Sequence, residues 1–175
     1  MAGQNLQINS LYNLNVYVDG VSYLGRCEEV DVPFPKSTPG DYKGLGMAGE
    51  AELPMGFGKL EGRIKWKSFD AQVMSLVVNP FAFHMFQFRG SVDQITAFGR
   101  AAQLPVVLLL TGWIKDPDKL QFKHQAAVEN TSTLAVQHSE LTIGGLQIFM
   151  YDVFANVFTV NGVDQLAQFN ANLGA

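Results

Sequence analysis

The residues at 44–49 match the glycine pattern of dinucleotide-binding loops. Gly44, Gly46 and Gly49 have the spacing G-x-G-x-x-G, and Asp70 follows where such proteins place the carboxylate that binds a ribose. In that motif the glycines let the backbone approach a pyrophosphate at the amino end of a helix. The pattern raises the hypothesis of a nucleotide-dependent enzyme.

The neighbouring residues disfavour this hypothesis. The motif has to follow a buried strand and to begin a helix, but Pro35 and Pro39 precede it and Pro54 would soon end a helix. Glycines that permit positive φ and close backbone contacts explain the pattern better. We expect no cofactor at 44–49, and nucleotide binding stays open as an alternative.

Other reactive side chains form no catalytic or metal-binding pattern in the sequence. His84, His124 and His138 are widely spaced and match no metal-ligand motif. Cys27 is the single cysteine, so it forms no intrachain disulfide, and we expect a small buried hydrophobe. We therefore expect no catalytic residue and no metal site.

Aromatic residues gather at Trp66, Trp113 and the phenylalanine-rich stretch 81–88. Proteins that stack single-stranded nucleic acid on such rings interleave them with Lys and Arg. Here the net charge is −4 and no basic run exists, which argues against phosphate binding. We expect these rings in the core or in a subunit interface.

The composition indicates one apolar domain covering 1–175. Hydrophobic residues make up 47% of the chain and charged residues only 16%, against about a quarter in typical globular proteins. Much of the surface is therefore expected to be interface. The amino terminus lacks the features of a signal peptide, and no apolar run approaches the roughly 20 residues of a membrane span. We expect synthesis in the cytoplasm and no membrane contact.

Turn residues divide the chain into strands. Alternating apolar residues flank Asp19-Gly20 and Gly144-Gly145, which predicts two hairpins with tight turns. Further strands are predicted at 27–32, 60–66, 81–89, 104–114 and 153–160. The stretch 90–103 is expected to be a loop.

Helical spacing appears at 69–77, with Ser68 as the expected N-cap and Asn79-Pro80 as the end. A short terminal helix is predicted within 163–172. These elements predict a mainly β fold: a β-sandwich or partly closed β-barrel with one packed α-helix and a long extended arm. Such a fold leaves strand edges that have to be paired or covered.

The predicted arm is the segment 33–62, rich in proline and glycine yet threaded with large apolar residues. A solvated linker would be poor in such residues, and compact domains rarely contain long irregular segments without a function. Ordering the segment costs more backbone entropy than burying its side chains returns, so we expect a second copy to complete it. The expected inter-subunit contacts are Tyr42, Leu45, Met47, Leu53, Met55 and Phe57.

Five segments, in order and at preserved spacing, resemble the major tail tube protein of contractile-tailed bacteriophages and R-type tailocins. They are VYVDGVSYLG at 16–25, YKGLGMAG at 42–49, FRGS at 88–91, TIGGL at 142–146 and VNGVDQL at 160–166. The likeness covers about 13–174, while 1–12 extends beyond the expected start and 91–130 shows little likeness.

The resemblance implies a structural subunit of a virion tail, assembled in the bacterial cytoplasm. It implies hexameric rings stacked into a hollow tube, with strands of six subunits forming an inner β-barrel and the arm reaching a neighbouring copy. The implied partners are further copies, a sheath protein, a tape-measure protein and DNA that passes without specific binding. A type VI secretion tube protein is the related alternative.

Overall fold

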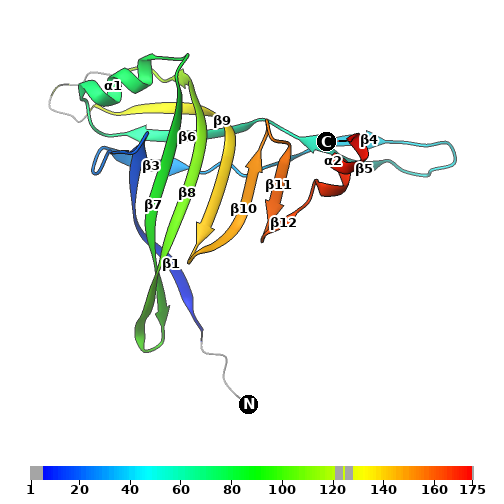
Figure 1. The fold of residues 1–175 in the computed structure, drawn as a ribbon, viewed down its shortest axis with the longest axis horizontal. Helices are drawn as coiled ribbons and strands as arrows, with labels where there is room; N and C mark the ends of the chain where they lie inside the picture. The colour runs from blue at the N-terminus through cyan, green and yellow to red at the C-terminus, as the bar shows by residue number, and fades with distance from the viewer. Residues whose placement is uncertain (1–5, 121–123, 125–127, 175) are drawn as a thin grey trace.

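A computed structural model describes residues 6–120, 124 and 128–174 (Figure 1). Antiparallel strands form most of it. In chain order the elements are β1 (Ile8–Val18), β2 (Val21–Ser22), β3 (Cys27–Asp31), β4 (Ser37–Tyr42), β5 (Ala51–Phe57), β6 (Leu60–Trp66), α1 (Ala71–Val78), β7 (Phe83–Thr96), β8 (Gly99–Pro117), β9 (Asn130–Ile143), β10 (Leu146–Asp152), β11 (Val157–Val160), β12 (Val163–Asp164) and α2 (Ala167–Leu173).

Ten of the described strands form one sheet in the order β12-β11-β10-β9-β8-β7-β1-β2, with β6 and β3 as a branch. The branch point is β9, which pairs with β8 along one edge. Along its other edge, β9 pairs first with β6, where Leu60 faces Val136, and then with β10, where Phe149 faces Leu141. The sheet stays open, which fits the predicted mainly β fold with a packed helix.

The predicted hairpin turns are confirmed. Asp19 and Gly20 both have positive φ, at 50° and 81°, and Gly144 and Gly145 repeat this at 60° and 84°. Two successive residues with positive φ form the turn whose twist matches that of a β-hairpin. Asn161 and Gly162, with φ of 50° and 80°, turn β11 into β12 in the same way.

One face of the sheet forms the core. In β6 the alternating residues Leu60, Ile64 and Trp66 are buried, as the sequence predicts. The indole Nε1 of Trp66 donates a hydrogen bond to Ser132 Oγ at 3.2 Å, so the buried polar atom is satisfied. The largest fully buried side chains around it are Phe86, Phe88, Leu110, Ile114 and Leu134. The aromatic stretch thus divides: Phe86 and Phe88 lie in the core, whereas Phe81 and Phe83 are exposed.

Helix α1 covers part of this core through Val73, Leu76 and Val77. The prediction that Ser68 is its N-cap is wrong. Asp70 has the extended backbone of a cap, and its carboxylate accepts a hydrogen bond from Val73 N at 3.0 Å. Ser68 instead donates to the Asp70 carboxylate at 2.9 Å and so supports the cap.

The predicted loop at 90–103 is also wrong. Strand β7 continues to Thr96, and β8 begins at Gly99, so the two form one long hairpin. Gly90 lies within β7. A larger residue would not fit there, because its Cβ would lie 2.9 Å from the carbonyl oxygen of Asn13 on β1. In Figure 1 this hairpin, with the start of β1 beside it, projects from the sheet at the end opposite α1.

The segment 33–62 contains a second projecting hairpin, β4 and β5, in place of the irregular chain expected from the sequence (Figure 1). Among the described strands these two pair only with each other. The two-stranded part ends at Phe57, and residues 60–62 already belong to β6. From here on, "the arm" means residues 37–57.

Candidate assembly surfaces

The arm exposes every apolar side chain that the sequence assigns to subunit contact. The exposed residues are Tyr42, Leu45, Met47, Leu53, Met55 and Phe57. They do not lie at one level of the arm. Leu45 and Met47 lie in the turn at the tip, whereas Phe57 lies at the base and is the least exposed, at 37%.

Phe57 joins the arm to the large sheet. Its ring lies 5.1 Å from that of Tyr151 on β10 and 5.0 Å from that of Phe158 on β11, measured between ring centroids. Tilted and edge-on ring pairs at such separations add to the stabilisation from burial. Phe57 therefore fixes where the arm leaves the sheet, a role that the sequence did not reveal.

Short local contacts close the tip of the arm. Met47 N donates to Gly44 O at 3.2 Å, Gly46 has a positive φ of 84°, and Lys43 pairs with Glu50 at 3.0 Å. The motif at 44–49 is therefore a hairpin tip between exposed strands, with neither a buried strand before it nor a helix after it. This context is incompatible with the dinucleotide loop, and Asp70 serves as a helix cap.

The end of the β7–β8 hairpin forms a second exposed apolar surface. We call residues 90–105, together with residues 8–12 of β1, the "tip hairpin". Its large exposed apolar residues are Ile8, Leu11, Tyr12, Ile95 and Phe98. Phe98 lies in the turn between the strands and is 93% exposed. Sequence patterning missed this surface because its strands bury no continuous apolar face and therefore show no clear alternation of apolar residues.

A buried carboxylate holds the tip hairpin in shape. Asp93 on β7 is almost fully buried, and its carboxylate lies 2.7 Å from Arg100 Nη2 across the hairpin. Gln103 Nε2 donates to the same carboxylate at 2.8 Å. The Arg100 guanidinium also lies 5.8 Å from the ring centroid of Tyr12 on β1. These contacts link all three strands, so the tip hairpin presents Phe98 from an ordered support.

A groove of about 440 Å³ lies where β9 changes partner from β6 to β10. Its apolar lining comes from the base of the arm, β6, β8, β9, β10 and the residue after β10: Phe57, Leu60, Trp113, Val136, Tyr151 and Val153. Charged side chains at Lys59, Glu61 and Lys115 also line it. Lys115 forms an ion pair with Glu61 and holds the pKa of that carboxyl below its ordinary value.

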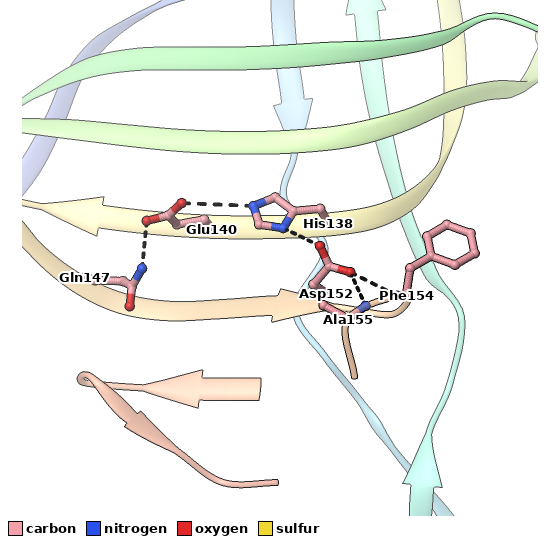
Figure 2. A network of polar contacts seen from close by, with 6 residues as sticks. All are labelled: His138, Glu140, Gln147, Asp152, Phe154 and Ala155. Atoms are coloured by element: carbon pink, nitrogen blue, oxygen red, sulfur yellow. Dashed lines mark hydrogen bonds and ion pairs between the residues drawn. The ribbon is translucent and has the colours of Figure 1, made fainter. Parts of the chain in front are cut away.

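A polar network crosses β9 and β10 (Figure 2). His138 Nδ1 lies 3.1 Å from Asp152 Oδ2, and its Nε2 lies 4.0 Å from Glu140. Gln147 Nε2 donates to Glu140 at 2.8 Å. The network ties the two strands together.

Asp152 also organises the turn after β10. Its Oδ1 accepts hydrogen bonds from Ala155 N at 2.8 Å and from Phe154 N at 2.9 Å (Figure 2). The hydrogen bond from Ala155 N, assisted by His138, holds the pKa of Asp152 below its ordinary value despite partial burial. Its chemistry is therefore that of a structural cap.

The remaining reactive residues lie apart from one another. His84 contacts Asp19 at 2.6 Å beside the first hairpin turn, far along the chain from His138. Cys27 is half-buried, and burial raises the pKa of its thiol to about 11. Among the described residues, no three His, Cys, Asp or Glu side chains gather closely enough to hold a metal ion. Neither described helix has the length and hydrophobicity of a membrane span.

The fold is an open β-sheet with two projecting hairpins that expose apolar side chains, and surfaces of this kind are typical of proteins that contact other chains. The chain belongs to the phage tail tube protein FII family, whose model matches residues 8–174. It is also similar to the tail tube protein of Escherichia phage P2, at 24% identity over 172 residues that cover 92% of this chain and 94% of that protein.

The protein is therefore a structural subunit of a phage tail tube and not an enzyme, which confirms the resemblance seen in the sequence. The family match covers the stretch 91–130, where the sequence alone showed little likeness, and residues 8–12 of the stretch 1–12. A phage family also favours a phage tail over a type VI secretion tube and leaves nucleotide-dependent catalysis without support.

Proposed function

We propose that six copies of this chain form a ring and that the rings stack into a hollow tube. The tube would lie inside a sheath and hold a tape-measure protein and then DNA. In this proposal the whole chain acts as one domain, assembled in the bacterial cytoplasm, and the arm is its main inter-subunit contact.

The observation that carries the proposal is the apolar surface of the arm. Leu45 at its tip is fully exposed, although it would gain roughly 1.5–3 kcal/mol from full burial, and Met47 beside it is exposed as well. Exposed apolar patches of this kind mark interaction sites. A second copy is the simplest partner, because a subunit that builds a tube has to contact its own kind on several sides.

Free strand edges support contacts between copies as well. At one end of the sheet β2 pairs only with Tyr17 and Val18 of β1, so the outer edge of β1 from Ile8 to Asn15 has no partner strand in the described chain. At the other end β12 is a strand of only two residues. A long free edge such as that of β1 invites pairing with further strands, as a continuous inner barrel requires.

The charge of the chain suits a conduit for DNA. Six copies, each with a net charge of −4, carry −24 per ring. A negative surface repels phosphates and lets DNA slide, whereas a basic one would hold it. DNA is therefore expected to pass through without specific binding.

Electron microscopy of negatively stained, concentrated protein tests the proposal directly. We expect rings with six-fold symmetry and hollow tubes of uniform diameter. A protein that remains monomeric at high concentration, by light scattering as well as by microscopy, would refute it.

A further inference from the structure

We propose that the tip hairpin of one copy docks in the groove of the next copy, where β9 changes partner from β6 to β10, with Phe98 as the inserted side chain. The occupant of the groove is thus a second copy of this chain. The inference rests on the proposed function, because it names a contact through which copies stack.

The two surfaces lie near opposite ends of the same strand. Strand β8 begins at Gly99, beside Phe98, and carries Trp113 and Lys115 of the groove toward its other end. At about 3.3 Å per residue, the 15 positions from Phe98 to Trp113 span at most about 50 Å. A copy shifted along β8 by about this length would bring its tip hairpin to the groove of the first.

Such a contact is head-to-tail, since the hairpin and the groove are different surfaces. A head-to-tail contact that does not close on itself repeats without limit and produces a filament. A tube subunit requires this geometry along the tube axis, and the chain has the two parts at suitable ends. A self-complementary contact through Phe98 on both sides would instead stop at a dimer.

The chemistry of the two surfaces matches. Phe98 presents an apolar ring at the end of an ordered hairpin and loses nearly all of its water contact on insertion. The groove is large enough for an aromatic side chain and offers Phe57, Trp113 and Tyr151 as ring partners. Aromatic anchors that fill apolar pockets supply most of the free energy in many interfaces.

Disulfide trapping between two single variants tests the contact. Phe98→Cys is mixed with Val153→Cys, which lies at the groove, and the mixture is assembled and then oxidised. Cys27 gives little background, because its half-buried thiol has a pKa of about 11 and thus carries little reactive thiolate. We expect a cross-linked dimer in the mixture and none in either variant alone.

The controls separate this inference from the proposed function. If the mixture of the two variants forms tubes, as wild-type protein does, but gives no cross-link, the docking is wrong and the tube stands. A cross-link between two copies of Phe98→Cys would also overturn the docking contact. So would a cross-link of Leu45→Cys with Val153→Cys, because it would make the arm the occupant of the groove. If wild-type protein forms neither rings nor tubes, the proposed function itself fails.

A charge at the tip gives a second, independent readout. Phe98→Asp should leave the circular dichroism spectrum unchanged, since the side chain touches no core residue, and should abolish tubes. The matched variant Phe98→Leu keeps an apolar side chain and should still form them. Tubes of normal length from Phe98→Asp would overturn the docking contact.

Discussion

Gly112 has no side chain at a point where the backbones of β8 and β9 approach each other closely. The register of the two strands shifts beside Gly112: Thr111 faces His138, whereas Gly112 faces Val136. A Cβ at Gly112 would lie 2.1 Å from the carbonyl oxygen of Ala135 and 3.1 Å from Cα of Val136. These are backbone atoms in a central strand, so they cannot move aside cheaply.

Gly112→Ala should therefore destabilise the protein by about 3 kcal/mol, at the upper end of the cost of overpacking. Urea unfolding of dilute, unassembled protein measures the effect. Gly49→Ala is the matched control, since a Cβ there would have no neighbour within 4 Å, and it should change stability little. Equal stabilities of the two variants would contradict the steric reading of Gly112.

Asp152 gives a residue-scale prediction on pH. Its folded-state pKa is lowered, so the stability it supplies is present above the ordinary carboxyl value and is lost as the pH falls through the folded value. The wild-type protein should therefore lose stability as the pH drops below about 4.

Two variants at Asp152 separate charge from geometry. Asp152→Ala removes the acceptor for Phe154 N and Ala155 N and should cost about 1–2 kcal/mol at neutral pH. Asp152→Asn keeps an acceptor oxygen and should retain part of this stability with a weaker dependence on acid. Thermal unfolding from pH 7 to pH 3 compares them; an unchanged acid dependence in Asp152→Asn would assign it to other carboxylates.

At the scale of elements, the arm carries a direct prediction. Replacing Leu45 and Met47 together by Asp should leave the fold intact, because both side chains are exposed and lie far from the core. The same change should abolish tubes, since two charges would have to be buried in the contact. Sedimentation and electron microscopy report both results, and normal tubes would refute the assignment of the arm.

The elements that the sequence predicts well are those with strong local signals. Asp19-Gly20 and Gly144-Gly145 predict their hairpins, and the spacing of Val73, Leu76 and Val77 predicts α1. Turn residues and a buried helical stripe are both signals that neighbouring residues of the sequence contain. The arm is likewise marked by its prolines and glycines. The sequence does not predict that the arm pairs as a hairpin, because Pro39 lies opposite Pro54 and strand propensities disfavour proline at paired positions.

The tip hairpin escaped prediction for a physical reason. Its strands are held by backbone pairing with β1 and by the ion pair of Asp93 with Arg100, not by a buried face. Polar and small residues such as Ser91, Asp93 and Gln94 therefore look like a loop. The cap of α1 was missed more narrowly, since Ser68 and Asp70 are both good caps and only the backbone decides between them.

For the whole molecule, the fold predicts that assembly changes the dynamics of one part far more than another. Within the described part of the chain, the arm forms backbone hydrogen bonds only within itself and around Gly58 at its base, whereas β9 is paired on both edges. Segments with few partners open readily and exchange their amide hydrogens fast. The arm should therefore be mobile in a protomer and ordered in a tube.

Hydrogen exchange in dilute protomers and in tubes measures this difference. Amides at 43–53 should slow by at least about tenfold on assembly, which corresponds to about 1.4 kcal/mol. Amides of β9 serve as the internal control and should be slow in both states. Full protection of the arm in a dilute protomer would remove the reason for a partner.

Strand β8 gives the molecule a mechanical property. It is held laterally by β7 from Gly99 to Trp113 and by β9 from Val106 to Pro117, so nearly its whole length is bonded on at least one side. A force directed along β8 loads these bonds together in shear, whereas a force across the sheet would open them in succession. The subunit should thus be stiff along the direction that joins Phe98 to the groove at β9, and compliant at right angles to that direction.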